Sequence, residues 1–147
     1  MKTKLALLLG MVLMATLMLT ACGGGTTVTT AVVKSVVMAK GVDANFLPVD
    51  PTTTFLPTDT IFVSTGFTGS PSQSVVNGKF YYGDQFISEA TLDITKAVTG
   101  DLVSYNGDTY TAFNLIPSDP WPVAATYRFE LYIDGVKVGE YPFAVVQ

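Results

Sequence analysis

The chain has 147 residues, 48% of them hydrophobic, with twelve acidic and eight basic side chains and no histidine. Without histidine, and with a single cysteine, neither a Ser-His-Asp or Cys-His catalytic arrangement nor a zinc site of the histidine or cysteine type can be assembled. There is no basic cluster and no phosphate-binding glycine motif, so we expect no nucleic-acid partner and no cofactor.

The chain begins with a short basic segment, followed by an apolar stretch at positions 5–19 and then by Leu19-Thr20-Ala21-Cys22. The apolar stretch is shorter than the roughly 20 residues of a stable membrane span. Basic, apolar and small-residue regions in this order are typical of a cleaved signal peptide. An uncleaved transmembrane anchor and an ordinary secretory signal are the alternatives.

The residues around Cys22 resemble the lipobox of bacterial lipoproteins. The resemblance implies cleavage before Cys22, a thioether to diacylglycerol on its sulfur, and durable anchoring by two or three acyl chains. In Gram-negative lipoproteins an aspartate after the cysteine commonly signals retention at the inner membrane, so Gly23 implies the outer membrane. We therefore expect a protein of the cell envelope that is bound to the membrane through lipid.

These boundaries predict three parts: a signal peptide at 1–21, the lipidated Cys22 with a glycine- and threonine-rich tether at 22–31, and a β domain at 32–147. Removing the signal also removes two lysines, which leaves twelve acidic and six basic side chains and a formal charge of −6. With Cys22 lipidated, no disulfide can form within the chain. The domain must therefore be stabilised by packing alone.

Alternation of apolar and polar residues, interrupted by glycine, proline, asparagine and aspartate, recurs through the rest of the chain without a convincing helical period. It predicts seven strands, the fifth of them a hairpin that would raise the count to eight, at 32–39, 60–65, 76–82, 86–94, 102–105 with 110–115, 125–133 and 136–145. Asn106-Gly107 and Asp134-Gly135 each suit a two-residue hairpin turn. Strands with one wet and one apolar face predict an antiparallel sandwich.

The segment Ala125-Thr126-Tyr127-Arg128-Phe129 resembles the start of strand F in immunoglobulin-like domains, which carry Ala-x-Tyr-x-Cys. The resemblance implies that Tyr127 forms a tyrosine corner, and that Phe129 and Phe80 replace the disulfide cysteine and the buried tryptophan. Over about the last 90 residues the chain is similar to Ig-like domains of poorly characterised bacterial lipoproteins. An all-β, antiparallel immunoglobulin-like β-sandwich of about seven strands is the fold that this resemblance implies.

Three aromatic residues are candidates for binding. Tyr81 and Tyr132 are expected to point outward from neighbouring strands and to form an exposed aromatic face for a sugar or a protein. Tyrosines in such positions also serve as cross-strand pairs without any ligand. Trp121, in a proline-flanked loop, is either a binding anchor or the residue that closes one end of the sandwich.

The long proline-rich segment after the first strand carries several oxygen-bearing side chains, namely Asp43, Asn45, Asp50 and Asp59. Calcium binds such ligands, but the spacing is not that of an EF-hand and these residues are ordinary turn formers. We expect no metal site, and no spacing of residues argues for catalysis. The sequence thus predicts a non-catalytic, lipid-anchored interaction or structural module with an envelope protein or a glycan as partner. The alternative is a carbohydrate- or small-ligand-binding module that uses Tyr81 and Tyr132.

Overall fold

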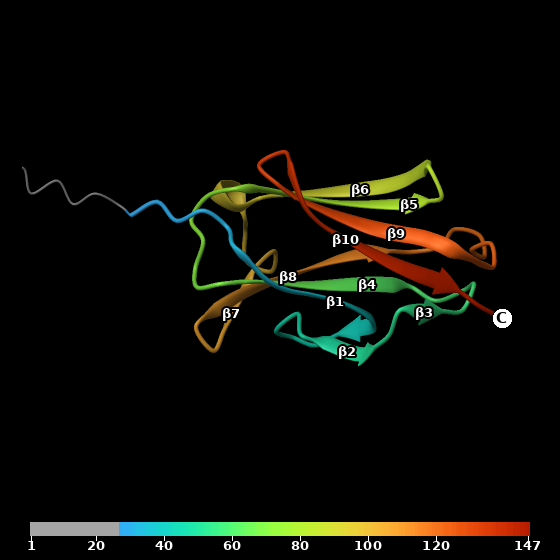
Figure 1. The fold of residues 1–147 in the computed structure, drawn as a ribbon. Coiled ribbons are helices and arrows are strands. Elements are labelled where there is room, and N and C mark those ends of the chain that lie inside the picture. Colours follow the sequence, from blue (N-terminus) through green and yellow to red (C-terminus); the bar gives the residue numbers. More distant parts are fainter. Residues whose placement is uncertain (1–26) are drawn as a thin grey trace, which may run out of the picture.

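A computed structural model describes residues 27–147, which form two five-stranded β-sheets packed face to face (Figure 1). The expected signal peptide, Cys22 and the beginning of the tether lie outside the described residues. Within 27–147 there is one short 3-10 helix, η1 (Ile94–Lys96). The described part of the chain holds no helix with the length and hydropathy needed to cross a membrane.

The first sheet has the strand order β2-β1-β4-β8-β7 and the second has the order β3-β10-β9-β5-β6. The strands of the first sheet are β1 (Val33–Val42), β2 (Pro48–Pro51), β4 (Ile61–Phe67), β7 (Val103–Tyr105) and β8 (Asp108–Leu115). Those of the second are β3 (Thr54–Phe55), β5 (Val75–Tyr82), β6 (Gln85–Asp93), β9 (Ala124–Ile133) and β10 (Val136–Val145). All pairs are antiparallel except β3 with β10.

The predicted all-β, immunoglobulin-like sandwich is confirmed, and every predicted strand is present with bounds shifted by at most a few residues. The prediction was incomplete in the proline-rich segment after β1, which contains β2 and β3 rather than only loop. Two residues of β3 are too few to show a period, and β2 has proline at both ends. Proline removes a backbone donor and is confined to sheet edges, where β2 lies.

The core lies between the sheets and is centred on aromatic rings. Phe80 of β5 and Phe129 of β9 are both buried, with ring centroids 4.9 Å apart. Phe113 of β8 reaches across from the other sheet to within 5.7 Å of Phe129. Gly78 makes room for this arrangement, because a Cβ there would lie 2.7 Å from the Phe129 ring. Aromatic packing thus stands where antibody-type domains have a disulfide and a tryptophan, as the resemblance implied.

Both predicted hairpin turns are confirmed. Asn106 and Gly107 have φ angles of 51° and 86°, and Asp134 and Gly135 have φ angles of 50° and 81°. Positive φ at both central residues is the geometry of a type I′ turn, whose twist matches that of the flanking strands.

The start of the described chain is attached to one end of the sandwich. The backbone N–H groups of Thr29 and Ala31 donate to the hydroxyls of Ser72 and Ser74, each at 3.0 Å. The Ser74 hydroxyl in turn donates to Asp134 in the β9–β10 turn. The β5–β6 turn and the C-terminus lie at the opposite end of the sandwich (Figure 1).

Candidate functional site

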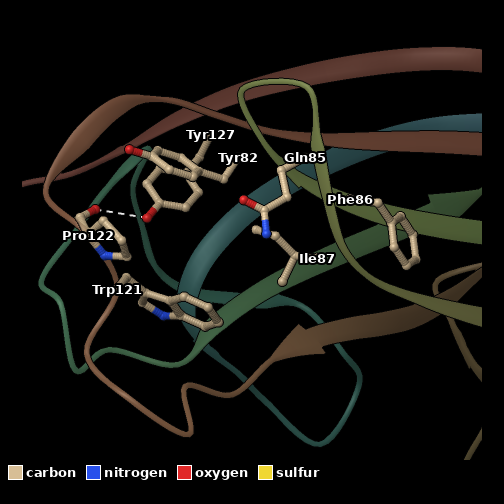
Figure 2. A pocket seen from close by; sticks show the side chains of 7 residues that line it. All are labelled: Tyr82, Gln85, Phe86, Ile87, Trp121, Pro122 and Tyr127. Carbon is tan, nitrogen blue, oxygen red and sulfur yellow. Dashed lines mark hydrogen bonds between the residues drawn. The ribbon is translucent and has the colours of Figure 1, made fainter.

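A pocket of about 360 Å³ opens at this opposite end, between the β5–β6 hairpin and the β8–β9 connection (Figure 2). Aromatic and aliphatic side chains dominate its lining, which consists of Tyr82, Gln85, Phe86, Ile87, Trp121, Pro122 and Tyr127. Its volume is within the range of small-molecule and side-chain binding sites. Gln85 contributes an amide and Tyr82 a hydroxyl to the lining residues, so the pocket combines apolar surface with groups that can donate and accept hydrogen bonds.

A β-bulge shapes the wall of the pocket that β6 contributes. Phe80 pairs with Ser88 and Tyr81 pairs with Phe86, so Ile87 is an extra residue without a partner in β5. A bulge of this kind re-aims side chains and bends the strand. Here it turns Ile87 inward, where it packs against the edge of the core.

Trp121 forms the opposite wall and is held by its backbone and by its ring. Its backbone N–H donates to the carbonyl oxygen of Pro57 at 2.8 Å, and its indole Nε1 donates to the carbonyl oxygen of Asp59 at 3.3 Å. The half-buried ring packs against the core and also lines the pocket. Trp121 thus packs against the core, as expected of a residue that closes one end of the sandwich. It also lines a pocket, as expected of a binding anchor.

Tyr127 forms the tyrosine corner that the resemblance implied. Its hydroxyl donates to the carbonyl oxygen of Pro122 at 2.8 Å and so fixes the end of the β8–β9 connection against β9. Burial raises the pKa of Tyr127, which keeps the phenol protonated as a donor. Its ring lies 4.8 Å from that of Tyr82, and both rings line the pocket (Figure 2).

Tyr81 and Tyr132 lie on the outer face of the second sheet, as predicted, but they do not form one aromatic patch. Tyr81 pairs with Arg128, whereas Tyr132 pairs with Asn77, so the two tyrosines lie at positions that are four residues apart along β5. The Arg128 guanidinium lies 4.3 Å from the centre of the Tyr81 ring. The Lys79 ammonium lies 4.8 Å from the centre of the Tyr132 ring. Each ring is therefore engaged by a cation of its own sheet.

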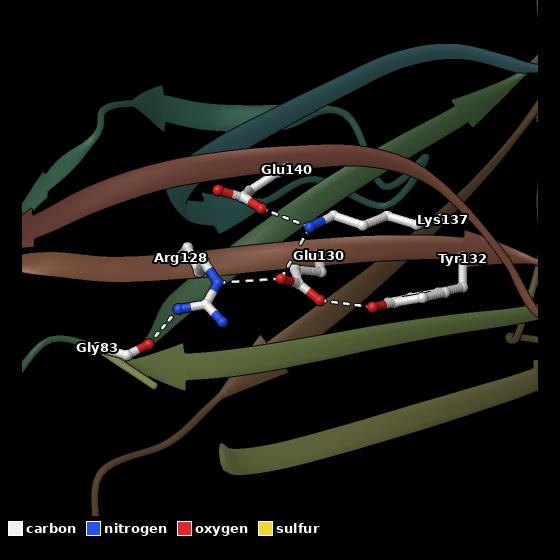
Figure 3. Close-up of polar contacts among 6 residues, drawn as sticks. All are labelled: Gly83, Arg128, Glu130, Tyr132, Lys137 and Glu140. Carbon is white, nitrogen blue, oxygen red and sulfur yellow. Dashed lines mark hydrogen bonds and ion pairs between the residues drawn. The ribbon is translucent and has the colours of Figure 1, made fainter. Parts of the chain in front are cut away.

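Glu130 organises the rest of this outer face (Figure 3). Only 5% of the residue is exposed. Its carboxylate accepts bonds from Arg128 at 3.0 Å, Tyr132 at 2.6 Å and Lys137 at 2.9 Å. Lys137 also pairs with Glu140, and Arg128 also donates to the Gly83 carbonyl. We call these five side chains, Arg128, Glu130, Tyr132, Lys137 and Glu140, the Glu130 network.

Two opposing effects set the pKa of Glu130. Burial by itself raises the pKa of the carboxyl, but the bonds from Tyr132, Lys137 and Arg128 outweigh it and hold the pKa at about 2. The bond to Glu130 raises the pKa of Tyr132, and the bonds to Glu140 and then to Glu130 raise the pKa of Lys137. At neutral pH the Glu130 carboxylate is therefore ionised, while Tyr132 and Lys137 are protonated.

The carboxylates of the proline-rich segment act locally. Asp43 accepts bonds from the backbone N–H groups of Asn45 and Leu47, and Asp59 accepts one from Leu56 and pairs with Lys40 at 3.0 Å. Backbone N–H donation from Leu56 and the Lys40 ammonium lower the pKa of Asp59. No three acidic or cysteine side chains within residues 27–147 are grouped so that they could hold a metal ion.

Sequence reasoning missed Tyr82, Gln85, Phe86 and Ile87 as pocket residues. Strict alternation does place Tyr82 on the face opposite Tyr81, so the sequence did contain a signal that Tyr82 points inward. The bulge that turns Ile87 inward depends on how β6 meets β5, and a single strand's sequence does not show it.

The sequence matches no protein-family model, and no curated protein matches it. Among solved structures, it is similar to the CARDB domain of a Pyrococcus furiosus protein, crystallised in complex with di-metal ions. The TM-score is 0.37 with 11% sequence identity, over 82% of this chain and 98% of that chain. The fold assignment therefore rests on the strand order and the tyrosine corner described above.

Proposed function

We propose that the chain is a non-catalytic binding module of the cell envelope, anchored through lipid at Cys22, whose binding site is the pocket beside Trp121. The observation that carries this proposal is the contrast between the outer face of the second sheet and the pocket at its end. The polar groups of the Glu130 network are already paired, whereas the aromatic pocket offers unfilled apolar volume.

A protein partner is favoured because the pocket lies beside a sheet edge and exposes an apolar rim. Phe86, half of which is exposed, borders the pocket on β6. A sugar ring is the second candidate, since Trp121 and Tyr82 offer ring faces and Gln85 offers an amide. Tyr81 and Tyr132 support the sugar interpretation less well, because cations lie over both rings.

Site-specific photo-cross-linking in intact cells tests the proposal. Benzoylphenylalanine replaces Phe86 at the pocket or, as a matched control, Tyr105, an exposed aromatic residue of β7 in the other sheet. We expect one dominant protein adduct from the Phe86 position and none from Tyr105. A glycan adduct supports the sugar-binding alternative, and equal or no adducts from the two positions contradict the proposed site.

The lipid anchor has a separate test. Metabolic labelling with a fatty acid should label the chain, and Cys22→Ser should abolish the label and release the protein from membranes. Label that persists in Cys22→Ser would contradict lipidation at this residue.

A further inference from the structure

The four strands at the sheet edges are unequal. In the first sheet, β2 has four residues with proline at both ends and β7 has three residues. In the second sheet, β3 has two residues, whereas β6 has nine and contains neither proline nor lysine. Short strands, prolines and lysines are the devices by which proteins prevent unwanted pairing at sheet edges. The strand β6 is neither short nor interrupted by proline or lysine, and its bulge at Ile87 lies near the β5–β6 turn and leaves residues 88–93 in regular register with β5.

A second pocket lies along the same strand. It has a volume of about 320 Å³ and is lined by residues that include Ala90 and Leu92 of β6 and Thr111 and Phe113 of β8. The strand β7 pairs with β8 only as far as Tyr110, so within the described chain no strand covers the far side of 111–115. The open side of the sandwich thus has free backbone on both sheets and a pocket at two points along β6.

The two pockets have the spacing that an added strand requires. Gln85 lines the first pocket and Ala90 the second. Their partners in β5 are Tyr82 and Gly78, because the bulge at Ile87 takes one of the positions between them. Four pleated positions therefore separate them, or about 13 Å at about 3.3 Å per residue. Side chains at positions i and i+4 of one extended strand lie on the same face at this separation, and could enter both pockets.

The charges around β6 favour a basic occupant. Four carboxylates border the groove: Asp84, Glu89, Asp93 and Asp101. Lys79 pairs with Glu89 at 3.6 Å and Lys96 with Asp93 at 2.7 Å. Among the described residues neither Asp84 nor Asp101 takes part in a salt bridge, so the border has an excess of negative charge. A second copy of this acidic chain is disfavoured, because two β6 edges would bring like charges together.

We propose that β6 and its two pockets form a groove that receives an extended strand of a partner protein, with large apolar side chains at i and i+4 and basic side chains between them. Backbone hydrogen bonds to β6 supply affinity in this mode of binding, and the two pockets supply specificity. The inference rests on the proposed function, since it assigns a class of partner to the same pocket.

Selection from a phage library of random peptides tests the groove, with the full chain in detergent micelles as the target. We expect enriched peptides to share apolar residues at i and i+4 with lysine or arginine between them. Their binding should slow amide hydrogen exchange in β6 and change the emission of Trp121, the single tryptophan of the chain. Absence of enrichment, or enrichment without this pattern, overturns the proposal.

A matched pair of variants tests the edge itself. Ala90 is exposed and pairs with Gly78, which faces the core, so Ala90→Lys puts an inward-pointing lysine on the edge. Ala44→Lys makes the same change at an exposed loop position. We expect at least a tenfold loss of peptide affinity in Ala90→Lys alone, with near-ultraviolet circular dichroism confirming that both variants are folded.

The outcomes separate the two proposals. Trp121 emission that responds to a peptide, without protection of β6 amides, keeps the pocket as a binding site and overturns strand addition. Equal affinity in Ala90→Lys and the native chain overturns strand addition too. If neither Trp121 nor β6 responds to any peptide, and Phe86 gives no adduct in cells, the proposed function fails as well.

Discussion

Tyr81 and Tyr82 are adjacent in β5, yet their rings lie in opposite kinds of environment. The Tyr81 ring is on the outer face, under the Arg128 guanidinium and against Phe86. The Tyr82 ring is on the inner side, packed at a tilt against Tyr127 and open to the pocket. On the outer face the polar and aromatic groups contact one another. On the inner side, at the pocket, apolar surface is not covered by other side chains. Exposure alone does not distinguish these cases, because both tyrosines are half-buried.

The largest effect is expected at Glu130. About 1.4 kcal/mol corresponds to one pKa unit, so a carboxyl held at about 2 rather than 4.5 contributes about 3 kcal/mol to the stability of the folded state at neutral pH. Because the folded-state pKa is lowered, this contribution is complete above pH 4.5 and is lost as the pH falls toward 2. Glu130→Gln should lose it at pH 7, as measured by urea unfolding across this pH range.

Glu140→Gln is the control for that series. Glu140 is exposed and pairs only with Lys137, so its loss should change stability by no more than about 0.5 kcal/mol. If the native chain and Glu130→Gln have the same pH dependence between pH 4.5 and 2, the network does not stabilise the fold in this way.

Tyr82→Leu is expected to have the next largest effect, on binding. The change removes the ring that lies between Tyr127 and the bound side chain but keeps an apolar residue. Peptides selected on the groove should bind at least about tenfold more weakly, as is typical for aromatic anchors in binding pockets. Titration of Trp121 emission measures the affinity. An unchanged affinity would place the binding site outside the pocket.

Tyr127→Phe should cost about 1 kcal/mol of stability, because the Pro122 carbonyl loses its donor. The β8–β9 connection should also loosen, so acrylamide should quench Trp121 more readily than in the native chain. Urea unfolding and quenching check the two parts. Unchanged values in both would show that the corner bond is dispensable for the pocket.

The smallest effect is expected for Tyr81→Leu. It removes the contact with Arg128, worth about 0.5–1 kcal/mol at such a site, and the contact with Phe86, but it replaces no residue that lines the pocket. Stability should fall by about this amount while peptide affinity stays unchanged. A loss of affinity equal to that in Tyr82→Leu would erase the distinction between the two faces.

The sequence predicted what depends on local pattern. Alternation gave the long strands, Asn106-Gly107 and Asp134-Gly135 gave the turns, and the residues around Tyr127 implied the corner. It did not predict the environment of Tyr81 and Tyr132, because the cations over their rings belong to other positions of the sheet. It also did not predict the pocket, whose walls come from three segments and from a bulge that depends on the pairing of two strands.

The attachment of Thr29 and Ala31 at one end of the sandwich has a consequence for reach. If Cys22 is lipidated as proposed, the end that carries Ser72 and Ser74 would face the bilayer. The pocket lies at the other end of β5, whose eight residues span about 26 Å. In that arrangement the length of the sandwich would separate the proposed binding pocket from the lipid headgroups and leave it accessible from the aqueous side.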